Sequence, residues 1–251
     1  MSRCLLLIFL ITVVSVRSEE NQIDDGAIKL FQSIGDHFRF SDQYSSLCSI
    51  TSNDGKGNIK TQNYKMFVKD ARTSLLYTLS PERDRGKMYL MRGKDIWCYF
   101  PKAGKSMMIS YNRTLMGTVN ISDFVNTELT EWYDLIDCDA TYTGETPVVV
   151  LTLKRKNAKA AYPFIKVYFD KNRIIQAESL SSSQILMRKI IYSDFLPARD
   201  GFYYATNIRI ENSMKSGEYS IIKISSLTVE KAIPEYYFSP DHLHRVIVQT
   251  P

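Results

Sequence analysis

The stretch Trp97-Cys-Tyr-Phe-Pro101 decides the fold more than any other part of the sequence. It follows the polar turn Gly93-Lys-Asp95, and Pro81-Glu-Arg-Asp-Arg-Gly86 lies upstream of it. Two short alternating segments joined by such a turn are typical of a β-hairpin. We therefore predict strands at Met88–Met91 and Ile96–Phe100. Proline ends the second strand because it lacks the N–H group that a sheet requires.

Both faces of the second strand are apolar, so both must be covered. Ile96, Cys98 and Phe100 share one face, and Trp97 and Tyr99 share the other. An aromatic pair on the inside of a curved sheet is suited to line an apolar ligand cavity. The predicted cavity wall comprises Phe67, Leu76, Met91, Trp97, Tyr99 and Met107. Which of these point inward depends on the parity of each strand, because a shift of one residue reverses the face.

Alternation with a period of two extends from Tyr44 to Tyr111 and again from Ala140 to Thr228, interrupted by turn-forming residues. This pattern predicts a mainly β (α+β) chain with roughly a dozen strands in one curled antiparallel sheet. The predicted strands are Tyr44–Ile50, Ile59–Val68, Thr73–Leu79, Lys87–Arg92, Ile96–Phe100, Lys105–Tyr111, Ala140–Thr143, Val148–Lys154, Phe164–Asp170, Ile174–Leu180, Ile185–Tyr192, Tyr204–Glu211 and Tyr219–Thr228.

Two segments have helical spacing and are predicted to form a lid over the sheet. In the first, the Asp24-Asp25 pair precedes an amphipathic helix at Ala27–Phe38, and acidic residues suit a helix N-terminus. In the second, Ser122 can cap a short helix. The predicted lid residues are Leu30, Phe31, Ile34, Phe38, Phe124, Val125 and Leu129.

Residues 1–18 have the pattern of a cleaved secretory signal peptide. Arg3 precedes an apolar run of 11 residues, Cys4–Val14, and the segment Val16-Arg-Ser18 provides a cleavage site after Ser18. A membrane-spanning helix needs about 20 apolar residues, so a retained anchor is the weaker alternative. We expect one domain at 19–251, exported and soluble after cleavage. Loss of Arg3 and Arg17 lowers the formal charge from +5 to +3, and the scattered basic residues do not indicate nucleic-acid binding.

Three cysteines remain after residue 18, namely Cys48, Cys98 and Cys138. An odd number allows at most one disulfide bond. Cys98 lies in the middle of an apolar strand, where a thiol behaves as a small hydrophobic group. Two alternatives stay open: a Cys48–Cys138 bridge, or three reduced thiols.

The sequence contains no motif for catalysis or for a cofactor, such as a nucleophile elbow or a phosphate-binding glycine loop. We therefore expect neither an enzyme nor a cofactor. His242 and His244 lie in a polar C-terminal tail without a neighbouring carboxylate or thiol, so no metal site is predicted. Asp134, Asp137 and Asp139 are interpreted as a solvated loop.

The order of several motifs resembles the LolA-like family of outer-membrane lipoprotein-sorting proteins. Pro-x-x-x-Arg-Gly86 is followed by a strand, a Gly-x-Asp turn and Ile96-Trp-x-Tyr-x-Pro101. Further matches are Met116-Gly117, Ser122-Asp-Phe124 and Tyr237-Phe-Ser-Pro-Asp-His-Leu243. The resemblance extends over residues 27–243. In well-known members an arginine in the strand before the first proline ties the lid closed, whereas Thr73–Leu79 contains no arginine.

The resemblance implies an incomplete antiparallel β-barrel, of the LolA/LolB kind, which is closed by helices and holds acyl chains. It further implies a monomeric periplasmic carrier that takes lipoproteins or phospholipids from an inner-membrane donor to an outer-membrane acceptor. The alternative is a lipid- or lipoprotein-sensing regulatory or envelope-assembly protein of the same fold. Such sensors usually carry an additional C-terminal domain, and the sequence ends soon after Leu243, which favours the carrier.

Overall fold

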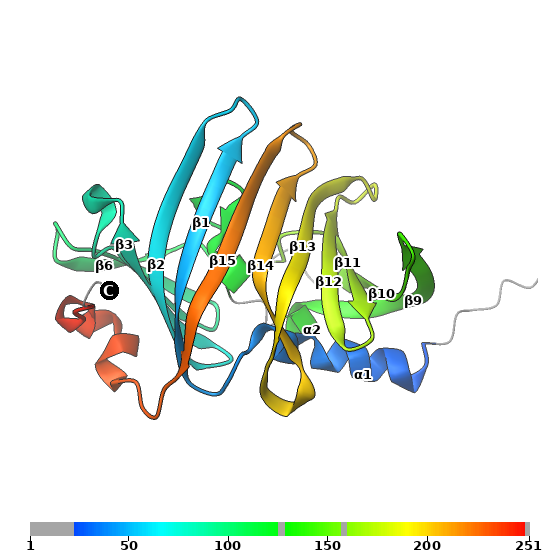
Figure 1. Ribbon diagram of the computed structural model, residues 1–251, viewed down its shortest axis with the longest axis horizontal. Coiled ribbons are helices and arrows are strands. Elements are labelled where there is room, and N and C mark those ends of the chain that lie inside the picture. Colours follow the sequence, from blue (N-terminus) through cyan, green and yellow to red (C-terminus); the bar gives the residue numbers. More distant parts are fainter. Residues whose placement is uncertain (1–22, 125–128, 157–159, 249–251) are drawn as a thin grey trace, which may run out of the picture.

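The period-two pattern of the sequence folds into one large antiparallel sheet of 13 strands. The computed structural model describes residues 23–124, 129–156 and 160–248. The strand order is β6-β5-β4-β3-β2-β1-β15-β14-β13-β12-β11-β10-β9. The sheet curls strongly, and in the described part of the chain its edge strands β6 and β9 do not pair with each other (Figure 1). The sheet is therefore an incomplete barrel, which confirms the predicted fold class.

The strands form two halves that meet where β1 pairs with β15. The N-terminal half comprises β1 (Tyr44–Asp54), β2 (Ile59–Asp70), β3 (Thr73–Ser80), β4 (Met88–Arg92), β5 (Asp95–Phe100) and β6 (Lys105–Ile109). The C-terminal half comprises β9 (Tyr133–Thr143), β10 (Thr146–Arg155), β11 (Phe164–Asp170), β12 (Arg173–Leu180), β13 (Leu186–Pro197), β14 (Tyr203–Asn212) and β15 (Glu218–Val229). A separate hairpin consists of β7 (Thr114–Met116) and β8 (Val119–Asn120).

Two parts of the strand prediction need correction. The acidic residues Asp134, Asp137 and Asp139 do not form a loop, because they belong to the edge strand β9. An edge strand keeps much of its surface in water, so it tolerates charged side chains. The hairpin of β7 and β8 was not predicted, since its two strands are too short for a period of two to be recognised.

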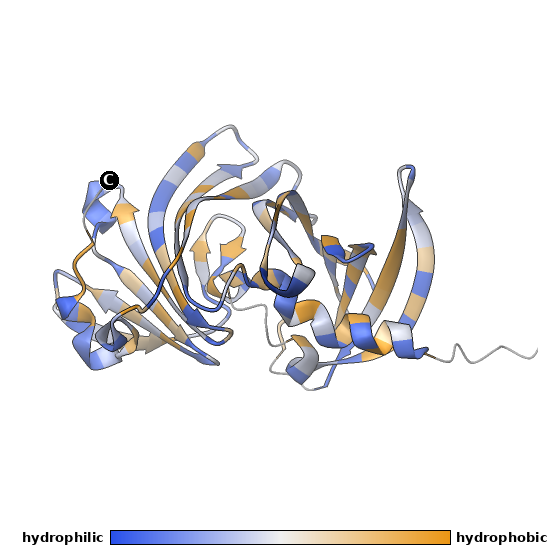
Figure 2. Cartoon of the chain, turned by 60° about the horizontal axis from the view of Figure 1, so that its bottom comes forward, coloured by the Kyte–Doolittle hydropathy of each residue, from blue (hydrophilic) through white to orange (hydrophobic). Residues whose placement is uncertain are grey.

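The predicted hairpin at Trp97 is confirmed. Met91 of β4 pairs with Ile96 of β5, and Gly93 in the turn has a φ of 56°, which glycine adopts without strain. Both faces of β5 are covered, as expected: Cys98 is buried on one face and Tyr99 on the other. Figure 2 shows the alternation of hydrophobic and hydrophilic residues along the strands.

The first lid segment consists of the α-helix α1 (Asp25–Ser33) followed by the 3-10 helix η1 (Ile34–Phe38). The predicted cap is confirmed, because Asp24 Oδ1 accepts a hydrogen bond from the backbone N–H of Ala27 at 2.6 Å. The predicted helix was continuous, whereas the α-helix ends at Ser33. The following Gly35 and Asp36 are poor helix formers, which accounts for the tighter final turns.

The second lid segment consists of the 3-10 helix η3 (Ile121–Phe124) and the short α2 (Leu129–Trp132). The predicted cap at Ser122 is wrong, because Ser122 lies inside η3. Asp123 has the capping role instead, and its carboxylate accepts a hydrogen bond from the backbone N–H of Asn120 at 2.8 Å. Among the described residues, no helix is long and apolar enough to cross a bilayer. The predicted signal peptide lies outside the described residues.

The C-terminal segment packs on the outer face of the sheet and is not a polar tail. It contains the 3-10 helices η6 (Glu235–Phe238) and η7 (Pro240–Arg245), which lie beside β3, β5 and β6 (Figure 1). Two further 3-10 turns, η2 (Glu82–Asp84) and η5 (Arg199–Gly201), connect strands. Apolar residues of the segment are buried with those of β3, β4 and β5. This outer cluster comprises Leu75, Met88, Leu90, Tyr99, Ile233, Phe238, Leu243 and Val246.

Candidate functional site

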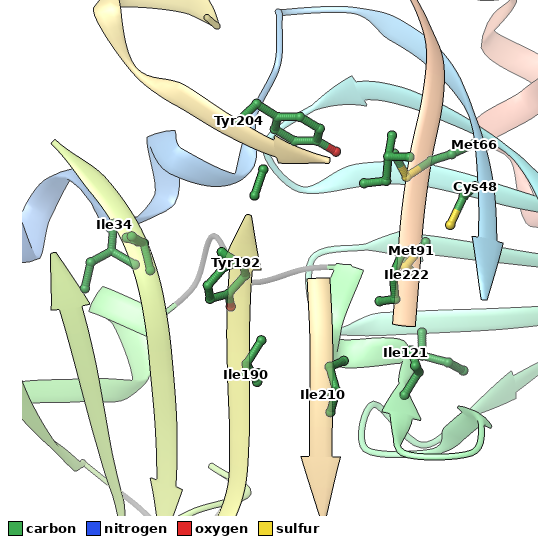
Figure 3. Close-up of a cluster of buried hydrophobic side chains, with 14 of the residues drawn as sticks. Ile34, Cys48, Met66, Met91, Ile121, Ile190, Tyr192, Tyr204, Ile210 and Ile222 are labelled. Carbon is green, nitrogen blue, oxygen red and sulfur yellow. The ribbon is translucent and has the colours of Figure 1, made fainter. Parts of the chain in front are cut away.

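The inner face of the curled sheet carries the larger apolar cluster, to which both halves contribute. Met66 and Met91 come from the N-terminal half, whereas Tyr192 and Ile222 come from the C-terminal half (Figure 3). The first lid segment adds Ile34, which is fully buried. The strands therefore form an apolar interior, which we call the inner cluster, and the two lid segments cover it.

Two cavities lie within this interior. The first has a volume of about 70 Å³ and the second a volume of about 90 Å³. Phe38, Asp123 and Tyr192 line both cavities. Pockets that hold small-molecule ligands typically have volumes of about 300–1,000 Å³. In this conformation side chains fill most of the interior, so a long ligand requires the lid segments to move.

Of the predicted lid residues, Phe38, Phe124 and Leu129 line the cavities, and Val125 lies outside the described residues. Phe38 of η1 lies next to the sheet, with its ring centroid 5.8 Å from that of Tyr192. The two lid segments also meet, because η1 lies against α2. The remaining members line a cavity or pack against the inner cluster, namely Leu30, Phe31, Phe124 and Leu129.

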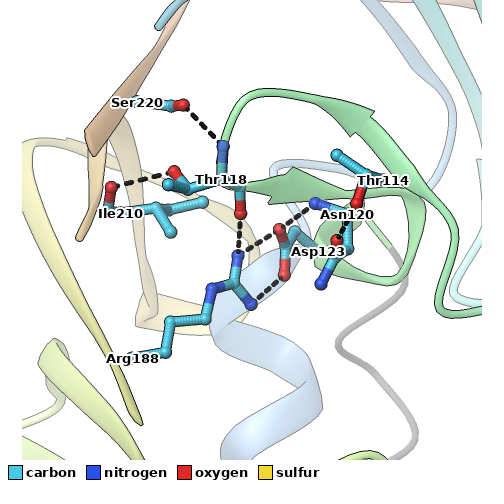
Figure 4. Close-up of polar contacts among 7 residues, drawn as sticks. All are labelled: Thr114, Thr118, Asn120, Asp123, Arg188, Ile210 and Ser220. Carbon is cyan, nitrogen blue, oxygen red and sulfur yellow. Dashed lines mark hydrogen bonds and ion pairs between the residues drawn. The ribbon is translucent and has the colours of Figure 1, made fainter. Parts of the chain in front are cut away.

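A buried ion pair ties the second lid segment to the sheet. Asp123 belongs to η3 and Arg188 to β13, and their side chains are only 7% and 9% exposed. Arg188 Nη1 donates to Asp123 Oδ1 at 2.7 Å, and Nη2 donates to Oδ2 and to the carbonyl oxygen of Thr118 (Figure 4). Burial disfavours the guanidinium charge, but the charge and hydrogen bonds of Asp123 outweigh it and raise the pKa of Arg188.

The hairpin of β7 and β8 leads into this ion pair and is itself fixed to the inner face. Thr118 donates through its backbone N–H to Ser220 Oγ at 3.0 Å, and through Oγ1 to the carbonyl oxygen of Ile210 at 3.0 Å (Figure 4). Gly117 has a φ of 54°, and a Cβ atom there would lie 2.4 Å from Ser52 Cβ. Any larger residue at the tip would therefore push the hairpin off the sheet.

His37 of η1 lines the first cavity with a buried imidazole ring. It is 5% exposed, and neither Nδ1 nor Nε2 has a partner. The rings of Phe169 and Phe202 contact it edge-on, at centroid distances of 5.5 and 4.9 Å. Burial in these apolar surroundings lowers the pKa of His37 to about 4, so the imidazole is neutral at neutral pH.

The six predicted wall residues are divided between the two faces. Leu76 and Met91 belong to the inner cluster, although neither lines a cavity. Met107 lies on the edge strand β6, where it pairs with Cys98 of β5, and it is 59% exposed. The structure places the three aromatic members on the outer face, in or against the outer cluster: Phe67, Trp97 and Tyr99. The C-terminal segment covers this face, so these three residues lie away from both cavities.

The cysteines and histidines do not form a metal or disulfide site in the described structure. Cys48, Cys98 and Cys138 are all free, which settles the open choice in favour of reduced thiols. Burial raises the pKa of the Cys48 thiol to about 12, so this thiol is unreactive at neutral pH. No group of three or more metal-ligating side chains occurs among the described residues.

Sequence reasoning missed Arg188 and His37. An arginine was sought in β3, whereas the tie comes from β13, more than a hundred residues later in the sequence. The sequence did contain an indication of this ion pair at Asp123, the partner of Arg188. Asp123 stands between Ile121 and Phe124 in a predicted apolar lid, and a carboxylate in such surroundings requires a partner. His37 offered no comparable signal, since its burial depends on Phe169 and Phe202 from distant strands and loops.

A family model described as "Uncharacterized protein" matches residues 70–245. No curated protein matches the sequence. Among solved structures, a LolA superfamily protein from Nitrosomonas europaea has a TM-score of 0.72 at 22% sequence identity. The match covers 85% of this chain and 97% of the chain of that protein.

Two further structures have the same fold. An outer membrane lipoprotein-sorting protein domain from Vibrio parahaemolyticus has a TM-score of 0.73 at 15% identity, and the match covers 87% of this chain and 98% of that domain. A DUF1329 family protein from Desulfovibrio piger has a TM-score of 0.72 at 20% sequence identity, and the match covers 84% of this chain and 97% of that protein's chain. At these identities the likeness establishes the LolA-like fold of the chain.

Proposed function

Since the chain belongs to the family whose model matches residues 70–245, and its fold is LolA-like, we propose that it is a carrier of acyl chains. It binds the chains of lipoproteins or phospholipids inside the curled sheet, outside the cytoplasm, and releases them toward the outer membrane. It performs no covalent chemistry. The signal peptide predicted at residues 1–18 would direct its export.

One observation carries this proposal: in the described part of the chain, a large apolar inner face is covered by short helical segments and the small hairpin of β7 and β8. A solid core would be covered by long elements with continuous packing, as in other packed interiors. Here α1 has 9 residues, η3 and α2 have 4 each, and two cavities remain beneath them. Segments of this kind belong to the least stable parts of a fold, where local opening costs little.

The energy of binding is sufficient to open the lid. Each methylene group that leaves water contributes about 0.8 kcal/mol, so five buried methylene groups contribute about 4 kcal/mol. Losing a buried ion pair such as Arg188–Asp123 costs a comparable amount when one partner stays buried, about 3–5 kcal/mol. A hydrocarbon chain can therefore replace the lid side chains in the interior. Without a ligand, the ion pair keeps the interior closed.

Two matched cross-links test the role of the lid. In a background without the native cysteines, the pair Phe38→Cys and Tyr192→Cys allows η1 to be linked to the inner face of β13. The ring centroids of the native residues are 5.8 Å apart. The control pair, Phe67→Cys with Tyr237→Cys, joins the C-terminal segment to β2, where the rings are 5.0 Å apart. A short bifunctional maleimide links either pair, and the unlinked form of each variant is its own reference.

We expect the first cross-link to block uptake of a fluorescent fatty acid, and the control cross-link to leave uptake unchanged. Native mass spectrometry of protein from an envelope extract should then show bound phospholipid or acylated peptide. Transfer of that ligand to acceptor vesicles distinguishes a carrier from a sensor, which would retain it. Absence of co-purified lipid, together with normal uptake in the fully cross-linked first variant, would refute the proposal.

A further inference from the structure

The first cavity combines an apolar wall with two nitrogen donors that have no partner. His37 has neither ring nitrogen hydrogen-bonded, and the buried Nε of Arg39 also lacks a partner. Both residues are among those that line this cavity, and they come from the same stretch at the end of the first lid segment. A buried polar group without a hydrogen bond destabilises the protein, so it calls for a specific explanation.

The other charged groups of this cavity already have partners. Asp123 is paired with Arg188, and Asp70 accepts a hydrogen bond from the backbone N–H of Arg72 at 2.8 Å. The guanidinium of Arg72 forms an ion pair with Glu131, with 3.4 Å between Arg72 Nη2 and Glu131 Oε2. Arg39 also contacts Asp42 through Nη2 at 3.2 Å, but Asp42 is exposed, so this contact leaves Nε inside unsatisfied. Two N–H donors therefore remain unpartnered in this cavity, one on the neutral imidazole of His37 and one at Arg39 Nε, beside one acceptor nitrogen of the same imidazole.

We propose that the first cavity binds the anionic head of an amphipathic ligand, with His37 and Arg39 donating to its oxygen atoms. The inference rests on the proposed function, because the hydrocarbon part of the same ligand would occupy the apolar interior. The shared chemistry is a negatively charged oxygen at the end of an acyl or alkyl chain, whether carboxylate or phosphate. Met66, Phe124 and Ile222, which line the same cavity, receive the first methylene groups.

The orientation of His37 supports this assignment. Two aromatic rings contact the imidazole, so its position does not depend on any hydrogen bond. A neutral imidazole supplies one N–H donor, and the Arg39 guanidinium supplies a charged one. Contact with an anion also favours protonation of His37, which would add the second donor. The site is therefore preorganised for an anion and receives its hydrogen-bonding partner only when the ligand enters.

The test compares three ligands that share one alkyl chain and differ in the head: dodecanoate, dodecyl phosphate and dodecanol. Each competes at pH 7.5 against a neutral fluorescent probe, N-phenylnaphthylamine. Hydrogen bonds to a charged group should make at least one anion bind about tenfold or more tightly than the alcohol. The tighter of the two anions identifies the head as carboxylate or phosphate.

His37→Leu and Arg39→Met should each reduce this preference and leave dodecanol binding unchanged. The matched controls are His244→Leu, which removes an exposed imidazole, and Arg83→Met, which removes an exposed guanidinium paired with Asp84. Both controls should keep the full preference. A direct readout is the imidazole signal in NMR, which His37→Leu assigns among only three histidines. The pKa of His37 should rise with the preferred anion and not with dodecanol.

Equal affinity of the wild-type protein for all three ligands would overturn the anionic site and leave the carrier function standing. The unpartnered donors would then be satisfied by water in the free protein. If none of the three ligands displaces the probe, the carrier function itself fails. A preference that persists in both His37→Leu and Arg39→Met also overturns the assignment, since the anion would then be recognised elsewhere.

Discussion

The inner and outer faces of the same strands are both apolar, yet they are covered in different ways. On the outer face, the C-terminal segment packs Phe238 and Leu243 with Leu75 and Leu90 in one buried cluster. The pocket at the edge of this cover is lined mainly by polar and charged residues, such as Lys69 and Glu235. On the inner face, the lid segments leave two cavities, a buried ion pair and an unsatisfied histidine. The outer cover is therefore suited to structural stability, whereas the inner cover is suited to opening.

This difference shows that apolar patterning alone does not identify a binding surface. Trp97 and Tyr99 have the stronger aromatic signal, and they lie under the solid cover. The smaller side chains of the inner face, including Met66 and Met91, lie in the interior beneath the lid. Imperfections in the cover, such as cavities and unmatched donors, indicate function more reliably than aromatic content.

The largest expected effect distinguishes the ion pairs of the two covers. Arg188→Met should lower the free energy of unfolding by about 3–5 kcal/mol, because it leaves Asp123 buried and unpaired. Lys69→Met breaks the exposed Lys69–Glu235 pair of the outer cover and should cost less than about 1 kcal/mol. Urea unfolding at pH 7.5 measures both. The double variant Asp123→Leu/Arg188→Met should recover most of the loss, and similar small losses in both single variants would contradict the distinction.

The second prediction uses two neighbouring residues of β4 that are both fully buried. Leu90 belongs to the outer cluster and Met91 to the inner cluster. Truncation of either to alanine should destabilise the protein by about 3 kcal/mol, since each leaves a cavity. Only Met91→Ala should change the affinity for a fluorescent fatty acid, measured on the folded fraction. A change of affinity in Leu90→Ala alone would mean that the outer face is the binding face.

The third prediction concerns the pH dependence of the inner cover. The pKa of His37 is about 4 when the protein is folded and about 6.5 when it is unfolded. The unfolded state therefore binds more protons between these values, and stability falls as the pH decreases from 6.5 toward 4. Between pH 7.5 and pH 5 the expected loss is about 2 kcal/mol. His37→Leu should lose about 2 kcal/mol less over this interval, and an identical pH profile in both proteins would refute the claim.

The smallest effect concerns the cap of the first lid segment. Asp24→Ala removes the acceptor for the Ala27 N–H and should cost about 1 kcal/mol. Since the lid opens locally, amide hydrogen exchange should accelerate in α1 and stay unchanged in the outer cluster. Asp25→Ala is the matched control, because it removes the same charge at the next position without removing the cap. Equal acceleration in both variants would assign the effect to charge.

The amino-acid sequence by itself determined most of the strands, the hairpin at Trp97 and the positions of the helical segments around α1 and η3. These features depend on local periodicity, turn residues and capping, all of which act within a few residues. The alternation along β5 also required that both faces be covered. The alternation does not show which face of the sheet lies under the lid segments and which lies under the C-terminal segment. Exchanging the two faces of every strand would leave the same alternating pattern.

Only the tertiary structure decided the contents of the candidate site. Arg188 meets Asp123 across 65 residues of sequence, and His37 becomes buried only because Phe169 and Phe202 come from distant parts of the chain. The outer position of Trp97 likewise depends on the C-terminal segment, which packs there more than a hundred residues later. Charge pairing and burial depend on distances in space, and these distances are set by the curl of the whole sheet.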